Sequence, residues 1–205
     1  METIAHHTCK KEGDEHFVLE NAPFLSEWIE LPNVPQNVIS QRRPFLGTGY
    51  YFWDFNIDMA EQWGKKHYNK SYYVIEYELC IDDEELLDLV GNRMHMSYFI
   101  NLINRLQASG KVIKPDLPNG RISVGKMIEV LKLFDSKEPG LFPFNVFKAV
   151  YHDTHTNYEI EQNRFVFVNK DSKVIAYTNL NPRIIICFKA IKRIHLQTKS
   201  IVRKG

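Results

Sequence analysis

Strand-forming segments gather at both ends of this chain, and helix-forming segments lie between them. The clearest strand is Ser71–Cys80, in which β-branched and aromatic residues alternate. Further strands are predicted over Thr3–Cys9, Phe144–Tyr151, Arg164–Val168, Lys173–Tyr177 and Ile184–Ala190. Helices are predicted over Ile57–Tyr68, Glu84–Val90, Met94–Ser109 and Val124–Asp135. This order predicts an α+β fold in a single domain, residues 1–205, with a helical insert at residues 82–138.

Composition excludes several classes of protein. A chain of 205 residues that is 44% hydrophobic is long enough to bury a core, and its 10 glycines and 9 prolines are too few for a disordered or collagen-like chain. We expect no membrane partner, because no apolar run approaches the roughly 18–20 residues of a membrane span. The first residues lack the features of a secretory signal, and three cysteines form neither a paired framework nor a CxxC motif. A cytoplasmic protein with reduced thiols is therefore expected.

The near-neutral net charge of +1 hides an asymmetry along the chain. No acidic residue follows Asp171, whereas Asp82–Glu85 is a run of four acids. The basic segment could contact a phosphate backbone or an acidic partner, or it could be a solvated tail and the outer face of a last strand. Its cations are Lys173, Arg183, Lys189, Lys192, Arg193, Lys199, Arg203 and Lys204.

The segment Phe45–Trp63, FLGTGYYFWDFNIDMAEQW, is the richest in candidate functional residues. Gly47 and Gly49 indicate a turn at which the backbone comes close to another group. Aromatic residues follow, and then the predicted helix from Ile57. Taken without its neighbours, this pattern is also typical of a loop that leads into a core strand.

This segment resembles the middle motif of ADP-ribosyltransferases, in the branch of poly(ADP-ribose) polymerases and diphtheria toxin. That motif is G-x-G-hydrophobic-Y-F, with an alanine on a helix nine residues after the tyrosine. The positions that match are Gly47, Gly49, Tyr51, Phe52, Asp54 and Ala60. The first strand resembles the companion motif H-G-[ST], with His6 in the histidine place, His7 in the glycine place and Thr8 in the hydroxyl place.

The resemblance implies a split β-sheet core that binds NAD as the substrate, without a metal. It implies that His6 hydrogen-bonds the adenosine ribose with Thr8 nearby, and that Tyr51 stacks on the nicotinamide ring. A carboxylate on a later strand would bind the 2′-hydroxyl of the reacting ribose and stabilise its oxocarbenium ion. The residues expected to bind NAD are His6, His7, Thr8, Gly49, Tyr50, Tyr51, Phe52 and Trp63.

Two residues are candidates for the third catalytic position, which the resemblance places on Tyr158–Val168. In a regular strand Glu159 and Glu161 face one way and Gln162 faces the other. Glu161 has the required charge, whereas Gln162 could bind the ribose hydroxyl but offers only a dipole. The expected catalytic set is His6, Tyr51 and either Glu161 or Gln162.

The expected function is that of an NAD-dependent mono-ADP-ribosyltransferase similar to compact bacterial toxins and phage-defence effectors. Its acceptor would be a nucleic acid, RNA or DNA, which the basic C-terminal segment slightly favours, or a protein. An antitoxin protein is a further partner that this resemblance suggests. The alternatives are an NAD glycohydrolase, in which water is the acceptor, and an inactive fold that binds nucleic acid.

Histidines outside these motifs are predicted to have no catalytic role. His152 and His155 could ligate zinc, but their spacing has no partner cluster, so a polar turn is favoured. We expect His67, His95 and His195 at the surface.

Overall fold

The structure is a computed structural model of the 205-residue chain. It describes residues 1–28, 44–69, 71–110, 113–117, 121–151, 164–168, 175–179, 182–192 and 195–205. Of residues 164–168 and 175–179 it describes the backbone alone.

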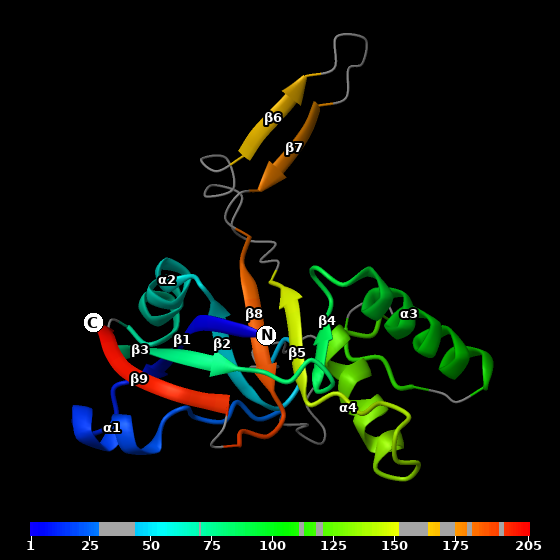
Figure 1. The fold of residues 1–205 in the computed structure, drawn as a ribbon, viewed down its shortest axis with the longest axis horizontal. Helices are drawn as coiled ribbons and strands as arrows, with labels where there is room; N and C mark the ends of the chain where they lie inside the picture. The colour runs from blue at the N-terminus through cyan, green and yellow to red at the C-terminus, as the bar shows by residue number, and fades with distance from the viewer. Residues whose placement is uncertain are drawn as a thin grey trace.

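A seven-stranded sheet with the order β4-β5-β8-β2-β1-β3-β9 forms the centre of the molecule (Figure 1). Neighbouring strands are antiparallel, except that β4 and β5 are parallel. The strands are β1 (Glu2–Lys10), β2 (Tyr50–Asp54), β3 (Tyr72–Cys80), β4 (Leu86–Asp88), β5 (Val146–Val150), β8 (Ile184–Phe188) and β9 (Leu196–Lys204). The sheet is therefore assembled from both ends of the chain.

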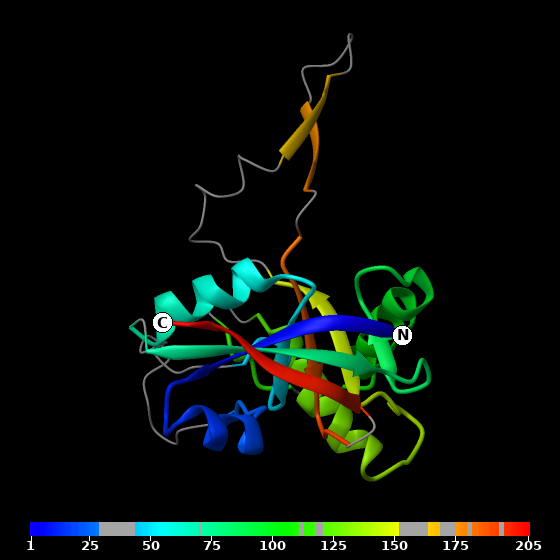
Figure 2. The ribbon, with the colours of Figure 1, turned by 60° about the vertical axis from the view of Figure 1, so that its left-hand side comes forward.

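The sheet divides between β1 and β2. The register joins these strands only at Ala5 opposite Asp54 and His6 opposite Trp53. Beyond that point β1 continues along β3 as far as Lys10, while β2 continues along β8. In Figure 2 the group β1, β3 and β9 runs across the group β2, β5 and β8, so the sheet curls into a half-barrel.

Four helices cover the sheet in the described part of the chain. Each begins at a side chain that accepts a hydrogen bond from the first turn, which satisfies backbone N–H groups that a helix start leaves open. The helices are α1 (Glu15–Asn21), α2 (Ile57–His67), α3 (Arg93–Ala108) and α4 (Val124–Asp135). Their N-cap residues are, in the same order, Asp14, Asn56, Asn92 and Ser123. Figure 2 shows α1 and α2 on opposite sides of β1, β3 and β9.

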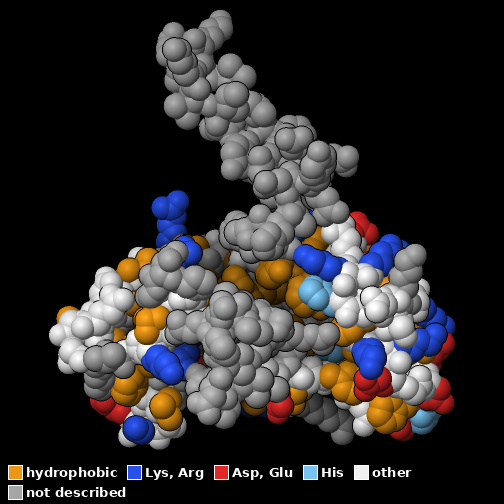
Figure 3. Space-filling view, turned by 180° about the vertical axis from the view of Figure 1, so that it is seen from behind, with side chains coloured by type: hydrophobic (Ala, Val, Ile, Leu, Met, Phe, Trp, Pro, Cys, Tyr) orange, Lys and Arg blue, Asp and Glu red, His pale blue; other side chains and the backbone are white. Residues whose placement is uncertain are grey.

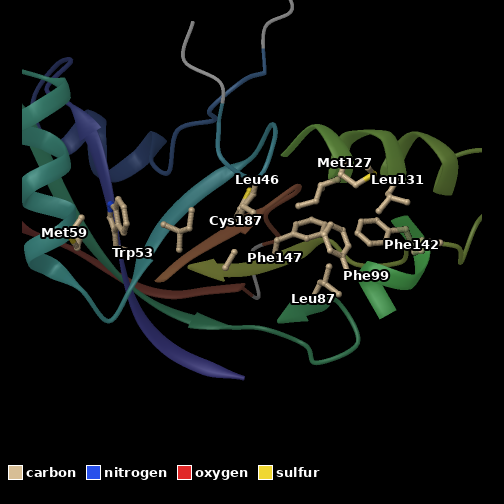
Figure 4. Packing of buried hydrophobic residues seen from close by; sticks show 14 of the residues in the cluster. Leu46, Trp53, Met59, Leu87, Phe99, Met127, Leu131, Phe142, Phe147 and Cys187 are labelled. Atoms are coloured by element: carbon tan, nitrogen blue, oxygen red, sulfur yellow. The ribbon is translucent and has the colours of Figure 1, made fainter. Parts of the chain in front are cut away.

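Each face of the sheet buries its own hydrophobic cluster. One cluster lies under α2, α3 and α4, and Figure 4 shows Trp53 and Met59 at one end of it and Phe99 and Phe142 at the other. The second cluster lies on the side of α1 and includes Phe52, which is fully buried. We call the first the α2-side face and the second the α1-side face.

The α+β class predicted from the sequence is confirmed, and the predicted strands and helices are present with one exception. The helix predicted over Glu84–Val90 is wrong, because residues 86–88 form strand β4. Leu86 and Leu87 are buried beside β5, and this tertiary pairing outweighs the local preference of a short segment. Within residues 82–138, α3 and α4 lie beside each other at one end of the sheet (Figure 1), whereas β4 belongs to the sheet itself.

Two further strands lie outside the seven-stranded sheet. β6 (Arg164–Val168) pairs antiparallel with β7 (Ile175–Asn179), and these two make a sheet of their own. Among the described residues, no helix has the length and apolar character needed to cross a membrane.

Candidate functional site

His6 and Tyr51 lie on the same face of the sheet, at the place where β1 and β2 diverge. His6 pairs with Trp53, and Tyr51 is two residues from Trp53 along β2. Because side chains alternate between the faces of a strand, Tyr51 shares the α2-side face with Trp53. Tyr51 is thus the next residue of β2 on this face beyond the His6–Trp53 pair.

His6 is held by a carboxylate that the sequence reasoning missed. The imidazole is 5% exposed, and its Nε2 lies 3.2 Å from Oε2 of Glu76, which stands directly opposite His6 in the pairing of β1 with β3. The sequence did contain a signal, because Glu76 interrupts the apolar residues that Tyr72 and Val74 begin on this face. His6 and Glu76 therefore form a lateral pair on the α2-side face.

Thr8 ties β1 to α2. Its Oγ1 donates a hydrogen bond of 2.8 Å to the carbonyl oxygen of Ala60, and both residues are buried. The alanine on the helix, which matches the middle motif, thus lies against the hydroxyl of the companion motif. The structure therefore brings together Thr8 and Ala60, two positions of separate motifs.

His7 points to the α1-side face and closes the gap between the diverging strands. Its Nδ1 donates to the carbonyl oxygen of Tyr51 (2.9 Å), and its Nε2 accepts from the backbone N–H of Phe24 (3.2 Å). Burial lowers the pKa of the His7 imidazole to about 4. The neutral ring thus bonds the backbone at the point where β1 and β2 are no longer paired. His7 therefore has a structural role.

The hydroxyl of Tyr51 is committed to the turn that precedes β2. It donates to the carbonyl oxygen of Gly47 (2.6 Å) and accepts from the backbone N–H of Leu46 (2.8 Å). Burial raises the pKa of the Tyr51 phenol well above its usual value, so the group stays protonated and can donate. The ring packs at the edge of the core, and its removal would also disturb the fold.

An ion pair fixes the same turn from the other side. Nζ of Lys189 lies 2.8 Å from the carbonyl oxygens of Leu46 and Thr48 and 2.8 Å from Oε1 of Glu129. Glu129 also accepts from the backbone N–H of Thr48 (2.7 Å). This network joins the turn to α4 and to the end of β8.

Gly49 sits where no side chain fits. A Cβ at this position would lie 2.4 Å from Sγ of Cys187 and 2.7 Å from the carbonyl oxygen of Phe188. We therefore expect Gly49→Ala to lower the free energy of unfolding by about 1–3 kcal/mol, because the backbone of β8 must move. Denaturant unfolding measures this, with Gly91→Ala as the control, whose Cβ would meet only the side chain of Asp88. Equal stability of the two variants would contradict the expected crowding.

Tyr50 and Phe52 lie on the α1-side face, away from Tyr51. The Phe52 ring is fully buried and packs edge-on against Tyr77 and Phe188, at centroid distances of 5.3 and 5.6 Å. Tyr50 packs at the border of the same cluster. In this arrangement both residues have a packing role, and Phe52 has no surface on which a ligand could rest.

Trp63 belongs to a group of aromatic rings on the α2-side face. Its ring centroid lies 5.9 Å from that of Trp53 and 6.0 Å from that of Tyr151, and 4.0 Å from the ring of His67. Phe45 joins the group through Tyr151, at 5.5 Å. Trp63 and Tyr151 are only partly buried, so this group could offer flat ring surfaces to a planar ligand.

Asp54, the remaining position matched to the middle motif, has a structural role. Its carboxylate lies 2.7 Å from Nζ of Lys148 on β5 and accepts a hydrogen bond of 2.6 Å from Oγ1 of Thr3. The ion pair is largely buried and joins β1, β2 and β5. It lies at the far end of β2 from Tyr51.

The two candidates for the third catalytic position, Glu161 and Gln162, lie outside the described residues, as do His152 and His155. The strand that follows the two candidates is β6, which belongs to the separate two-stranded sheet. Within the described ranges, no group of three or more His, Cys, Asp or Glu side chains could hold a metal ion.

The expectation that His195 lies at the surface is wrong, since this residue is 3% exposed. Its Nε2 contacts Oε2 of Glu85 at 3.1 Å, and its Nδ1 accepts from the backbone N–H of Lys192. The cysteines are free thiols, as predicted. Burial raises the pKa of Cys9 to about 11 and of Cys187 to about 12, so neither is an activated nucleophile.

Comparison with protein-family models, with curated proteins and with solved structures finds no match to this chain.

Proposed function

We propose that this chain is an NAD-dependent mono-ADP-ribosyltransferase with the split sheet of that family. The observation that supports this most is the meeting of the two motifs. His6 and Tyr51 come from adjacent central strands, share one face and stand where those strands diverge. Thr8 and Ala60, from the same two motifs, are joined by a hydrogen bond under α2.

In the proposed reaction the bond between nicotinamide and ribose breaks, and neutral nicotinamide leaves with the electron pair. The positive charge that develops on the ribose needs a nearby carboxylate, which Glu161 would supply. A nucleophile of the acceptor then bonds to the same ribose carbon and loses its proton. His6 would bind the adenosine ribose. The hydroxyl of Tyr51 is already bonded to the turn, so Tyr51 would contact NAD through its ring, which would stack on nicotinamide.

Free nicotinamide, measured after the purified chain is mixed with NAD, tests the proposal. We expect release by the wild type and its loss in His6→Ala, whereas the control His16→Ala, at an exposed position of α1, should remain active. Melting temperatures of both variants identify any loss of fold. A folded wild type that releases no nicotinamide would overturn the proposal.

The acceptor is proposed to be a macromolecule, with a nucleic acid slightly favoured by the basic C-terminal segment. Several cations of that segment are already paired, since Lys189 contacts Glu129, Lys192 contacts Glu85 and Lys204 contacts Glu15. Figure 3 likewise shows Lys and Arg side chains interspersed with Asp and Glu at one end of the visible face. The charge that this segment offers to phosphates is therefore smaller than the sequence alone suggests.

Labelled NAD in a cell extract identifies the acceptor. Label that disappears with nuclease indicates a nucleic acid, and label that disappears with protease indicates a protein. Nicotinamide release without any labelled macromolecule would indicate that water is the acceptor, as in a glycohydrolase.

Glu161→Gln is expected to slow nicotinamide release by about 10²-fold while the KM for NAD changes little, because the charge acts mainly in the transition state. Steady-state kinetics measures both constants. Glu138→Gln, at an exposed position just after α4, is the control. An unchanged rate in Glu161→Gln, together with a large gain in Gln162→Glu, would assign the third position to Gln162 instead.

A further inference from the structure

One ring nitrogen of His6 has no hydrogen-bond partner among the described residues. Two side-chain polar atoms in the described part of the chain are buried without a hydrogen bond, Nδ1 of His6 and the hydroxyl of Tyr77. Buried polar groups in native structures nearly always have a partner, so each such atom needs an explanation.

Glu76 determines which His6 nitrogen carries the proton. A carboxylate only accepts hydrogen bonds, so the contact of 3.2 Å requires the hydrogen on Nε2 of His6. In the neutral ring, Nδ1 is then an acceptor. His7 is the opposite case within the same strand, because both of its nitrogens are satisfied by protein groups.

We propose that Glu76 is a positioning residue, which holds His6 with Nδ1 as an acceptor for a ribose hydroxyl of NAD. This inference rests on the proposed function. The pair is built into the sheet, because Glu76 faces His6 across the β1–β3 register. Trp53 is paired with His6 on the other side, in the β1–β2 register. The ligand hydroxyl supplies the donor that the described protein residues do not provide.

A purely structural role for the His6–Glu76 pair predicts a different effect of replacing Glu76. The side chain of Glu76 is 40% exposed, so water can solvate the carboxylate when its hydrogen bond to His6 is lost, and this bond adds little to stability. A structural role would change only the melting temperature when Glu76 is replaced. A positioning role changes the tautomer of His6 and the binding of NAD.

Nitrogen-15 NMR of the imidazole rings tests the inference on the wild type, Glu76→Leu and the control Glu78→Leu. Glu78 lies two residues further along β3 and on the same face. We expect the Nε2–H tautomer of His6 in the wild type and in Glu78→Leu, and loss of this preference in Glu76→Leu. Added NAD should shift the Nδ1 resonance of the wild type.

Kinetics supplies the second measurement. In Glu76→Leu we expect the KM for NAD to rise about tenfold with kcat within about twofold, because an interaction remote from the broken bond is lost. The same tautomer in Glu76→Leu and in the wild type would overturn the inference, whether or not nicotinamide is released. A wild type that releases no nicotinamide would overturn the proposed function, and the tautomer measurement would still decide the role of Glu76.

Discussion

Acidification from pH 6.5 to pH 4 is expected to remove about 3 kcal/mol of unfolding free energy through His7 alone. Burial lowers the pKa of the folded imidazole from 6.5 to about 4. Between these values the unfolded chain binds a proton that the folded chain does not. The stabilisation is therefore fully present above pH 6.5 and is lost as the pH falls through 4.

Denaturant unfolding at several pH values, with the wild type and His7→Asn, measures this contribution. The variant should be less stable at neutral pH, because the bonds to Tyr51 and Phe24 are lost, and the difference should shrink toward pH 4. Other acid-sensitive groups are present in both proteins and cancel in the comparison. His16→Asn, at a side chain that is 80% exposed, should follow the wild type. Parallel stability curves for the wild type and His7→Asn would show that His7 does not carry the effect.

Phe52→Ala is expected to lower the free energy of unfolding by about 3–5 kcal/mol. The ring is fully buried, and three rings surround it at centroid distances of 5.3 to 5.7 Å, those of Tyr77, Phe188 and His7. Its loss leaves a cavity in the α1-side core that these rings cannot fill without leaving their strands. Urea unfolding of the purified variant gives the value.

Phe55→Ala is the matched control, because Phe55 lies just beyond the end of β2 and is 76% exposed. Its replacement should change stability by less than about 0.5 kcal/mol. If Phe52→Ala is as stable as this control, the assignment of Phe52 to the core is wrong. If it is less stable and still releases nicotinamide at low temperature, the ring has no direct role in NAD binding.

The motif residues show which structural features a sequence pattern can predict. The middle motif predicted a turn at Gly47 and Gly49 and a helix from Ile57, and the structure has both, with strand β2 between them. The motif predicted NAD binding by both Tyr51 and Phe52, although the side chains of neighbouring residues in a strand point to opposite faces of the sheet. Which face carries a ligand and which is core depends on the helices that cover them, and those come from distant parts of the chain.

Glu76 and His195 show what local patterns could not reveal. Glu76 is one acid in an otherwise clear strand, and its meaning depends on the register that places it opposite His6. His195 follows a basic segment that is typical of a surface, yet Glu85, 110 residues away, holds it in the interior. Contacts over such separations cannot be inferred from neighbouring residues.

The sequence by itself determined most of the helices and strands, the α+β class and the free thiols, because periodicity and composition act over a few residues. Only the tertiary structure decided that residues 86–88 are a strand, since the parallel pairing with β5 buries Leu86 and Leu87. It also decided that β1 and β2 part after His6, where the imidazole of His7 takes the place of backbone pairing. Both outcomes depend on hydrogen bonds and burial between segments far apart in the chain, and a local pattern contains no information on these.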